Sequence, residues 1–198
     1  MNHSQNIHPV FDQLLQRANR EQALGQKAKV IWLTGLSGSG KSTLAAGLER
    51  ALHNVGKHVF VLDGDNVRMG INNNLGFSEE DRTENIRRVA EVAKLFLDAG
   101  IIIICSFVSP TRDIRSVARN IIGTTDFLEV YVNASLATCE SRDVKGLYAK
   151  ARRGEIKDFT GIHQAFEAPD HHWLEIKTDQ SGIDTCLTEL VNAVNKEI

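Results

Sequence analysis

Eight consecutive residues, Gly35-Leu36-Ser37-Gly38-Ser39-Gly40-Lys41-Ser42, match the phosphate-loop pattern G-x-x-x-x-G-K-[ST]. In this pattern the glycines let the backbone wrap around a polyphosphate, and the backbone N–H groups bind phosphate oxygens. Lys41 is expected to reach the β- and γ-phosphates, and Ser42 to offer its hydroxyl to Mg²⁺. An apolar run precedes the loop and a helical pattern follows it, which favours a phosphate site over a flexible Gly/Ser turn. The sequence therefore predicts a purine triphosphate with magnesium as the ligand.

Two carboxylates follow the second apolar run, in Asp63-Gly64-Asp65-Asn66-Val67-Arg68. The carboxyl ends of parallel strands meet at one edge of a sheet, so this segment is expected beside the phosphate loop. One carboxylate could order Mg²⁺ or its waters while the other accepts a proton from an attacking hydroxyl. We assign the second task to Asp63, with Asp65 as the alternative. A polar turn that only ends a strand is the competing interpretation, and the neighbouring phosphate loop disfavours it.

Two further segments are expected near the same edge, and each has two interpretations. Ser109 and Pro110 end the third apolar run, where a capped strand-to-helix turn and an active-site segment fit equally well. A basic stretch from Arg142 through Lys145 to Lys157 follows the fourth run. It is either a mobile lid that closes over ATP and neutralises charge on the transferred group, or a solvated helical face.

The rest of the chain alternates between short apolar runs, typical of strands buried on both faces of a parallel sheet, and amphipathic helical patterns. The sequence predicts strands at 30–34, 58–62, 101–107, 128–132 and, more weakly, 173–176, and helices at 42–55, 80–99, 112–122 and 183–194. This alternation predicts an α/β fold of the P-loop NTPase type, a doubly wound parallel sheet with helices on both faces. We expect residues 1–28 to form a helical extension, one amphipathic helix closed by Gly25, and residues 29–198 to form the kinase domain.

Composition narrows the class of protein. The chain has 198 residues, 42% of them hydrophobic and 24% charged, which is the balance of one globular domain. Its formal net charge of −2 predicts no nucleic-acid or membrane-surface partner. The first residues lack a signal-peptide pattern, and three widely spaced cysteines compose neither a disulfide framework nor a zinc site. We expect a cytoplasmic protein with a small-molecule substrate, no membrane contact and a homodimeric state.

The main rival use of such a fold is a GTPase switch, which needs an Asn-Lys-x-Asp element that reads guanine. The nearest string is Asn195-Lys196-Glu197-Ile198, which lacks the Asp. A kinase of a small metabolite is therefore favoured. A nucleotide-dependent binding module that has lost turnover is the second hypothesis, and an ATP-consumption assay would separate the two.

From about Val30 to Pro169 the chain resembles adenylylsulfate kinase (APS kinase), in its stand-alone form, since 198 residues leave no room for a sulfurylase domain. The resemblance implies that ATP phosphorylates the 3′-hydroxyl of adenosine 5′-phosphosulfate, giving 3′-phosphoadenosine 5′-phosphosulfate and ADP. The segments that match, in the family's order, are 35–43, Asp63 to Arg68, Asn74 to Ser78, Asp81 to Arg88, Phe107 to Pro110, Cys139 to Tyr148 and Phe159 to Ile162.

The resemblance also implies roles for individual residues. Phe77 and Phe159 would hold the substrate adenine between two rings, and Arg68, Arg82 and Asn85 would hold the phosphosulfate end. Asp65, Ser109 and Lys145 complete the expected substrate site, and the expected catalytic residues are Lys41, Asp63, Asp65 and Ser109. The expected ATP-binding residues are Gly35, Leu36, Ser37, Gly38, Ser39, Gly40, Lys41, Ser42, Thr43 and Arg142.

Departures from the family pattern occur mostly late in the chain, at Phe166 and at His163 and Gln164, with another at Thr111. Phe166 stands in Ala165-Phe166-Glu167-Ala168-Pro169, where the family commonly has a tyrosine. The aromatic ring is kept and the phenol hydroxyl is lost. Any hydrogen bond from that hydroxyl is therefore absent here, whereas the reaction does not depend on it.

Overall fold

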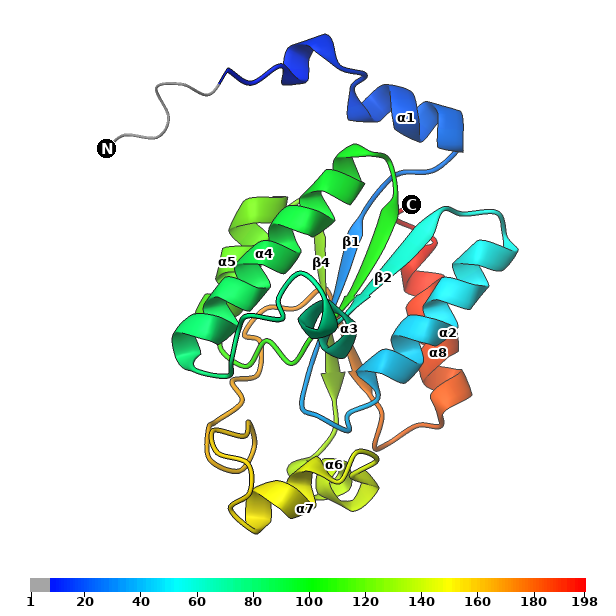
Figure 1. Ribbon diagram of the computed structural model, residues 1–198. Coiled ribbons are helices and arrows are strands. Elements are labelled where there is room, and N and C mark those ends of the chain that lie inside the picture. Colours follow the sequence, from blue (N-terminus) through cyan, green and yellow to red (C-terminus); the bar gives the residue numbers. More distant parts are fainter. Residues whose placement is uncertain (1–7) are drawn as a thin grey trace.

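The computed structural model describes residues 8–198. Its centre is a five-stranded parallel sheet with strand order β2-β3-β1-β4-β5 (Figure 1). The elements in chain order are η2 (Phe11–Gln13), α1 (Arg17–Leu24), β1 (Val30–Thr34), α2 (Lys41–Asn54), β2 (Val59–Asp63), α3 (Gly64–Met69), α4 (Glu79–Asp98), β3 (Ile102–Ser106), α5 (Arg112–Ile122), β4 (Phe127–Asn133), α6 (Leu136–Arg142), α7 (Leu147–Arg152), β5 (Leu174–Lys177) and α8 (Ile183–Val194).

Helices cover both faces of the sheet, which confirms the predicted doubly wound α/β fold. Helices α2 and α8 lie on one face, and α4 and α5 lie on the other (Figure 1). In β1, Ile31 and Leu33 pack towards α2 and α8, whereas Val30 and Trp32 pack towards α4 and α5. Because each of these β1 side chains meets a layer of helices, the strand is apolar at consecutive positions rather than alternating.

The predicted element boundaries agree with the structure within about two residues, which is the usual margin at helix ends. The helix expected at 80–99 begins one residue earlier because Ser78 caps it, its Oγ accepting a hydrogen bond from Asp81 N at 3.1 Å. Thr111 caps α5 in the same way, accepting from Ile114 N at 3.3 Å. These caps fix where the helices begin relative to the strand ends.

The three cysteines, Cys105, Cys139 and Cys186, are unpaired and buried. Burial raises the pKa of each thiol above its usual value. They act as small core residues, as the sequence indicated. Within residues 8–198, none of the helices combines the length and the apolar character needed to cross a membrane.

The N-terminal segment differs from the single amphipathic helix predicted for it. It contains the short η2 and then α1, separated by extended backbone at Leu14 and Gln16. The apolar side chains meant to form the buried stripe, Leu14 and Leu15 among them, are 53% and 71% exposed, so no packing holds that stretch in a helix. The predicted end at Gly25 is confirmed, because Gly25 ends α1 with a φ of 62°. Residues 1–7 of that expected helix lie outside the described residues.

An ion pair and hydrogen bonds tie α1 to the sheet. Arg17 Nη1 lies 2.6 Å from Asp126 Oδ2, and Arg17 Nη2 donates to the Ala28 carbonyl. Glu21 accepts from Ala28 N at 2.8 Å. Helix α1 is thus held at the end of the sheet opposite the phosphate loop (Figure 1).

The core under α2 makes a first testable prediction. Leu48 is fully buried, whereas Leu95 on α4 is 65% exposed. We expect Leu48→Ala to lower the free energy of unfolding by about 2–5 kcal/mol, because it leaves a cavity between helix and sheet. Leu95→Ala is the matched control and should change it by about 0.5 kcal/mol or less. Equal effects in urea unfolding would contradict this packing.

Candidate active site

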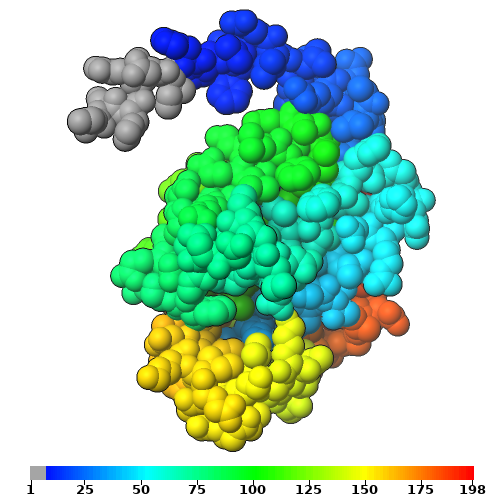
Figure 2. Space-filling view, viewed as in Figure 1, coloured from blue at the N-terminus to red at the C-terminus, as the bar shows by residue number. Residues whose placement is uncertain are grey.

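One cavity of about 970 Å³ opens at the carboxyl edge of the sheet, a volume at the upper end for small-molecule sites. Figure 2 shows it as a hollow between the yellow segment around residues 145–155 and the rest of the molecule. Nearly all predicted site residues line it; Gly35, Leu36 and Ser39 do not. Those that do are Ser37, Gly38, Gly40, Lys41, Ser42, Thr43, Asp63, Asp65, Arg68, Phe77, Arg82, Asn85, Ser109, Arg142, Lys145 and Phe159.

The phosphate loop joins β1 to α2, and its glycines are required by close contacts. A Cβ atom on Gly35 would lie 2.4 Å from the carbonyl oxygen of Val132, and one on Gly38 would lie 2.8 Å from that of Cys139. Both glycines and Gly40 also have positive φ, where other residues are strained. The loop therefore fits closely against the end of β4 and against α6.

Lys41 is the first residue of α2, and its side chain is buried against the phosphate loop. Its Nζ donates to the carbonyl oxygens of Gly35 at 2.9 Å and Leu36 at 2.8 Å. Burial lowers the pKa of Lys41 to about 8. The ammonium group is thus held at the loop where a polyphosphate would lie.

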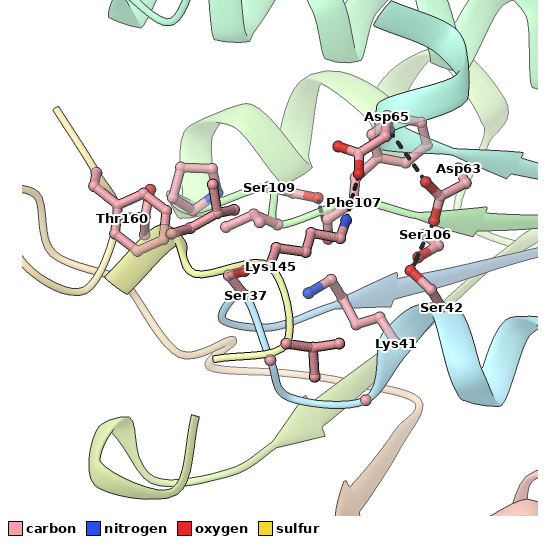
Figure 3. A pocket seen from close by; sticks show the side chains of 18 of the residues that line it. Ser37, Lys41, Ser42, Asp63, Asp65, Ser106, Phe107, Ser109, Lys145 and Thr160 are labelled. Carbon is pink, nitrogen blue, oxygen red and sulfur yellow. Dashed lines mark hydrogen bonds and ion pairs between the residues drawn. The ribbon is translucent and has the colours of Figure 1, made fainter. Parts of the chain in front are cut away.

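Asp63 lies beside Ser42, the residue predicted to face magnesium. Ser42 Oγ donates to Asp63 Oδ2 at 2.8 Å, and Asp63 Oδ1 accepts from Asp65 N at 3.1 Å, which caps α3 (Figure 3). The Oγ of Ser106, at the end of β3, lies 3.5 Å from that of Ser42. Carboxylate and hydroxyl oxygens are the hard ligands that Mg²⁺ prefers, so this group fits the ion.

Asp65 points across the cavity and forms an ion pair with Lys145 (Figure 3). Both side chains are largely exposed, at 70% and 57%, so the contact can open at little cost. The pair joins α3 to the loop that follows α6.

The predicted basic stretch divides into two parts. Arg142, Lys145 and Lys157 line the cavity, as the lid interpretation requires. Arg152 instead pairs with Glu140, and Arg153 pairs with Glu155, at the surface. The solvated-face interpretation therefore holds for Arg152, at the end of α7, and for Arg153, which follows it.

Aromatic and basic side chains gather in the half of the cavity away from the phosphate loop. The Arg68 guanidinium lies 4.4 Å and that of Arg82 5.6 Å from the centre of the Phe77 ring. Arg82 Nη2 also donates to the carbonyl of Asp158 at 2.7 Å. Burial lowers the pKa of both arginines, which nevertheless stay charged at neutral pH. This half can bind an anion beside an aromatic ring.

Phe159, which follows α7 in the chain, lines the same cavity. Its ring meets that of Tyr148 edge-on, with 5.0 Å between centroids, and Tyr148 OH donates to the Ser37 carbonyl at 2.9 Å. Tyr148 thus links the phosphate loop to the aromatic part of the site, a role that the sequence did not indicate.

Ser109 lies at the cavity edge but is 2% exposed and has a positive φ of 41°. Trp32 Nε1 donates to its Oγ at 3.0 Å, and Arg115 Nη1 donates to its carbonyl at 2.8 Å. Arg115 is in turn paired with the buried Glu129 at 2.8 Å. A buried ion pair therefore holds this turn. The sequence did not indicate the pair, because Glu129 stands within the otherwise apolar run of β4.

Arg142 contacts the back of the phosphate loop. It donates to the carbonyls of Gly38 at 3.2 Å and Thr178 at 2.6 Å. Thr178 Oγ1 donates to the Ser39 carbonyl at 2.7 Å. Thr178 was not among the predicted residues, although it directly follows the fifth strand and so reaches the same edge.

Phe166, a departure from the family pattern, does not line the cavity. Its ring stacks on Tyr131 with 5.9 Å between centroids, and the Arg115 guanidinium lies 5.7 Å away. A phenylalanine fills this place by packing alone.

A phosphate loop, two carboxylates and several cations around one cavity define a P-loop phosphotransferase. The chain belongs to the adenylylsulphate kinase family, whose model matches residues 27–177. It is 57% identical over 190 residues to the adenylyl-sulfate kinase of Phocaeicola vulgatus, covering 96% of this chain and 93% of that one. With that of Bacteroides thetaiotaomicron the identity is 56% over 198 residues, covering 100% and 98%. The predicted family is therefore confirmed.

Comparison with solved structures also supports this family. The APS kinase of Mycobacterium tuberculosis in complex with AMPPNP and APS has a TM-score of 0.82 and 44% identity, covering 85% of this chain and 98% of that chain. A gluconokinase from Sinorhizobium meliloti has a TM-score of 0.54, covering 86% and 91%, and at 13% identity shares the fold alone.

The pKa of Lys41 predicts how ATP binding depends on pH. Above about pH 8 the free protein loses the Lys41 proton, whereas bound polyphosphate needs the charged form, so binding must recover that proton. The ATP dissociation constant should therefore rise with pH above that value, by up to about tenfold per unit. Calorimetric titration measures it. Lys41→Arg keeps its charge and should flatten the slope; a flat wild-type profile up to about pH 9.5 would contradict the claim.

Proposed function

We infer that this protein transfers the γ-phosphoryl group of ATP to the 3′-hydroxyl of adenosine 5′-phosphosulfate, giving 3′-phosphoadenosine 5′-phosphosulfate and ADP. The observation that carries this inference is the single cavity that joins a phosphate loop to a second half lined by Phe77, Phe159 and two arginines. One half suits a nucleoside triphosphate and the other a purine with an anionic tail. Residues 29–198 would form the kinase unit.

On the ATP side, we propose that the backbone of the phosphate loop binds the phosphate oxygens and that Lys41 stabilises charge on the β- and γ-phosphates. The Ser42 hydroxyl would bind Mg²⁺, which supplies further charge neutralisation on those groups. Arg142 stabilises the loop from behind through the Gly38 carbonyl.

On the acceptor side, Asp63 is the proposed group that orients the 3′-hydroxyl and accepts its proton. It follows β2 and lies next to the phosphate loop through Ser42. The rings of Phe77 and Phe159 would bind the adenine, a contact worth about 1–3 kcal/mol per stacked base. Arg68 and Arg82 would bind the phosphosulfate through charge-assisted hydrogen bonds.

Ser109 is better suited to positioning than to carrying the phosphoryl group. Its Oγ is buried and accepts the Trp32 indole hydrogen, and its own proton is directed to the Phe107 carbonyl, 3.4 Å away. A nucleophile needs a base within reach, and these partners offer none. We propose a single direct transfer, with Ser109 fixing the turn at the end of β3.

We further propose that the metal is magnesium, that the protein is a homodimer and that it is located in the cytoplasm. The exposed apolar side chains of Val10, Phe11, Leu14 and Leu15 are surface that a second copy could cover. A 27% identical relative, which this chain spans over 32% of its length, is described as a hexameric APS kinase from Thiobacillus denitrificans. Light scattering of the purified protein measures the state directly.

The acceptor is tested by ATP consumption with adenosine 5′-phosphosulfate, AMP, adenosine and gluconate in parallel. We expect turnover with the first, and little with AMP or adenosine because both lack the sulfate that the arginines would bind. Gluconate is the control substrate, because a gluconokinase shares this fold at 13% identity. Comparable turnover of gluconate or adenosine would contradict the proposal.

The roles of the two carboxylates are tested by exchanging each for its amide. Asp63→Asn keeps size and most hydrogen bonding but removes the proton acceptor, so we expect turnover to fall on the order of a hundredfold while ATP binding persists. Asp65→Asn is the matched change and should cost less, since its carboxylate pairs with Lys145 instead. Normal turnover in Asp63→Asn with loss in Asp65→Asn would reverse the assignment.

A further inference from the structure

Asn72 is a fully buried polar residue with no part in the mechanism above. It lies in the turn after α3, where its backbone N–H donates to the Val67 carbonyl. Its side chain reaches α4: Nδ2 donates to Asn85 Oδ1 at 2.9 Å and lies 3.4 Å from the backbone oxygen of Asn85. A backbone carbonyl can only accept a hydrogen bond. The NH₂ group of Asn72 must therefore face α4.

This contact fixes the amide of Asn85 in turn. Its Oδ1 faces the NH₂ of Asn72, so its own NH₂ points the other way. Among the hydrogen bonds formed within residues 8–198, none uses Asn85 Nδ2 as a donor. Asn85 is itself 4% exposed and lines the cavity, one helical turn after Arg82. The group it offers to a bound molecule is thus a hydrogen-bond donor.

We propose that Asn72 is a positioning residue that fixes the Asn85 amide so that its NH₂ donates to an oxygen of the substrate's phosphosulfate group. The inference rests on the function proposed above. An anionic oxygen only accepts hydrogen bonds, and an Asn85 amide turned by 180° would present its own oxygen and repel it.

The unpaired end of Asn72 supports this role. In the described part of the chain, Asn72 Oδ1 is buried without a hydrogen-bond partner, and such atoms destabilise a fold. An apolar side chain would pack in this place without that loss. Only the donor end, directed at Asn85, accounts for an asparagine here.

The test is Asn72→Asp, because an ionised carboxylate accepts but cannot donate, so it draws the NH₂ of Asn85 away from the cavity. We expect the KM for adenosine 5′-phosphosulfate to rise about tenfold or more, and the KM for ATP to stay within about twofold. Asn73→Asp is the matched control, the same change at the neighbouring exposed position, and should leave both constants unchanged. Asn72→Leu, which has similar volume and no charge, should also raise only the first constant.

Asn85→Ala separates positioning from a general loss of structure. If Asn72 acts through Asn85, adding Asn72→Asp to Asn85→Ala should change the KM for adenosine 5′-phosphosulfate by less than about twofold. Additive effects, equal rises in both KM values, or a value in Asn72→Asp matching that in Asn73→Asp would each overturn the inference. A wild-type protein that does not turn over this substrate would instead overturn the proposed function, and the inference with it.

Discussion

The closed turn of backbone between Gly35 and Gly40 is the feature on which the rest of the site depends. Its shape needs left-handed backbone at Gly38 and Gly40, and it leaves no room for a side chain against Val132 and Cys139. The loop packs closely against the end of β4 and against α6. Lys41 and Ser42 reach a bound phosphate chain from the start of α2, and the other groups reach it from the ends of neighbouring strands.

The order of the strands provides those groups. With β1 in the centre, β3 and β4 are its neighbours and β2 and β5 the outer strands. Asp63 ends β2, the Ser109 turn follows β3, and Thr178 follows β5. A hydrogen bond to a residue of another segment holds each of them in place. The buried Arg115–Glu129 pair is one such support. Rigid placement of this kind suits phosphoryl transfer, where positioning and electrostatic stabilisation supply most of the rate.

The sequence predicted the sheet, the four helices that cover it and the phosphate loop because each is a local pattern, whereas the short helices α3, α6 and α7 were not predicted. Nearly all of the site residues that it singled out line the cavity, since these follow strand ends or match the family's motifs, whereas Tyr148 and Thr178 line it without having been predicted. It could not predict contacts between distant residues: Trp32 with Ser109, and Asn72 with Asn85, are each separated by more than ten residues and carry no spacing signal. The prediction of a single N-terminal helix is wrong because, in the described chain, its regularly spaced apolar side chains have no surface to pack on.

The central claim is a single direct transfer between two molecules held in one cavity. The most direct measurement is the configuration at a chiral, isotopically labelled γ-phosphate after transfer to the acceptor. One in-line displacement inverts the configuration. We expect inversion, because the Ser109 hydroxyl is buried and already hydrogen-bonded to Trp32. Retention would mean two successive transfers through a phosphorylated side chain and would contradict this account.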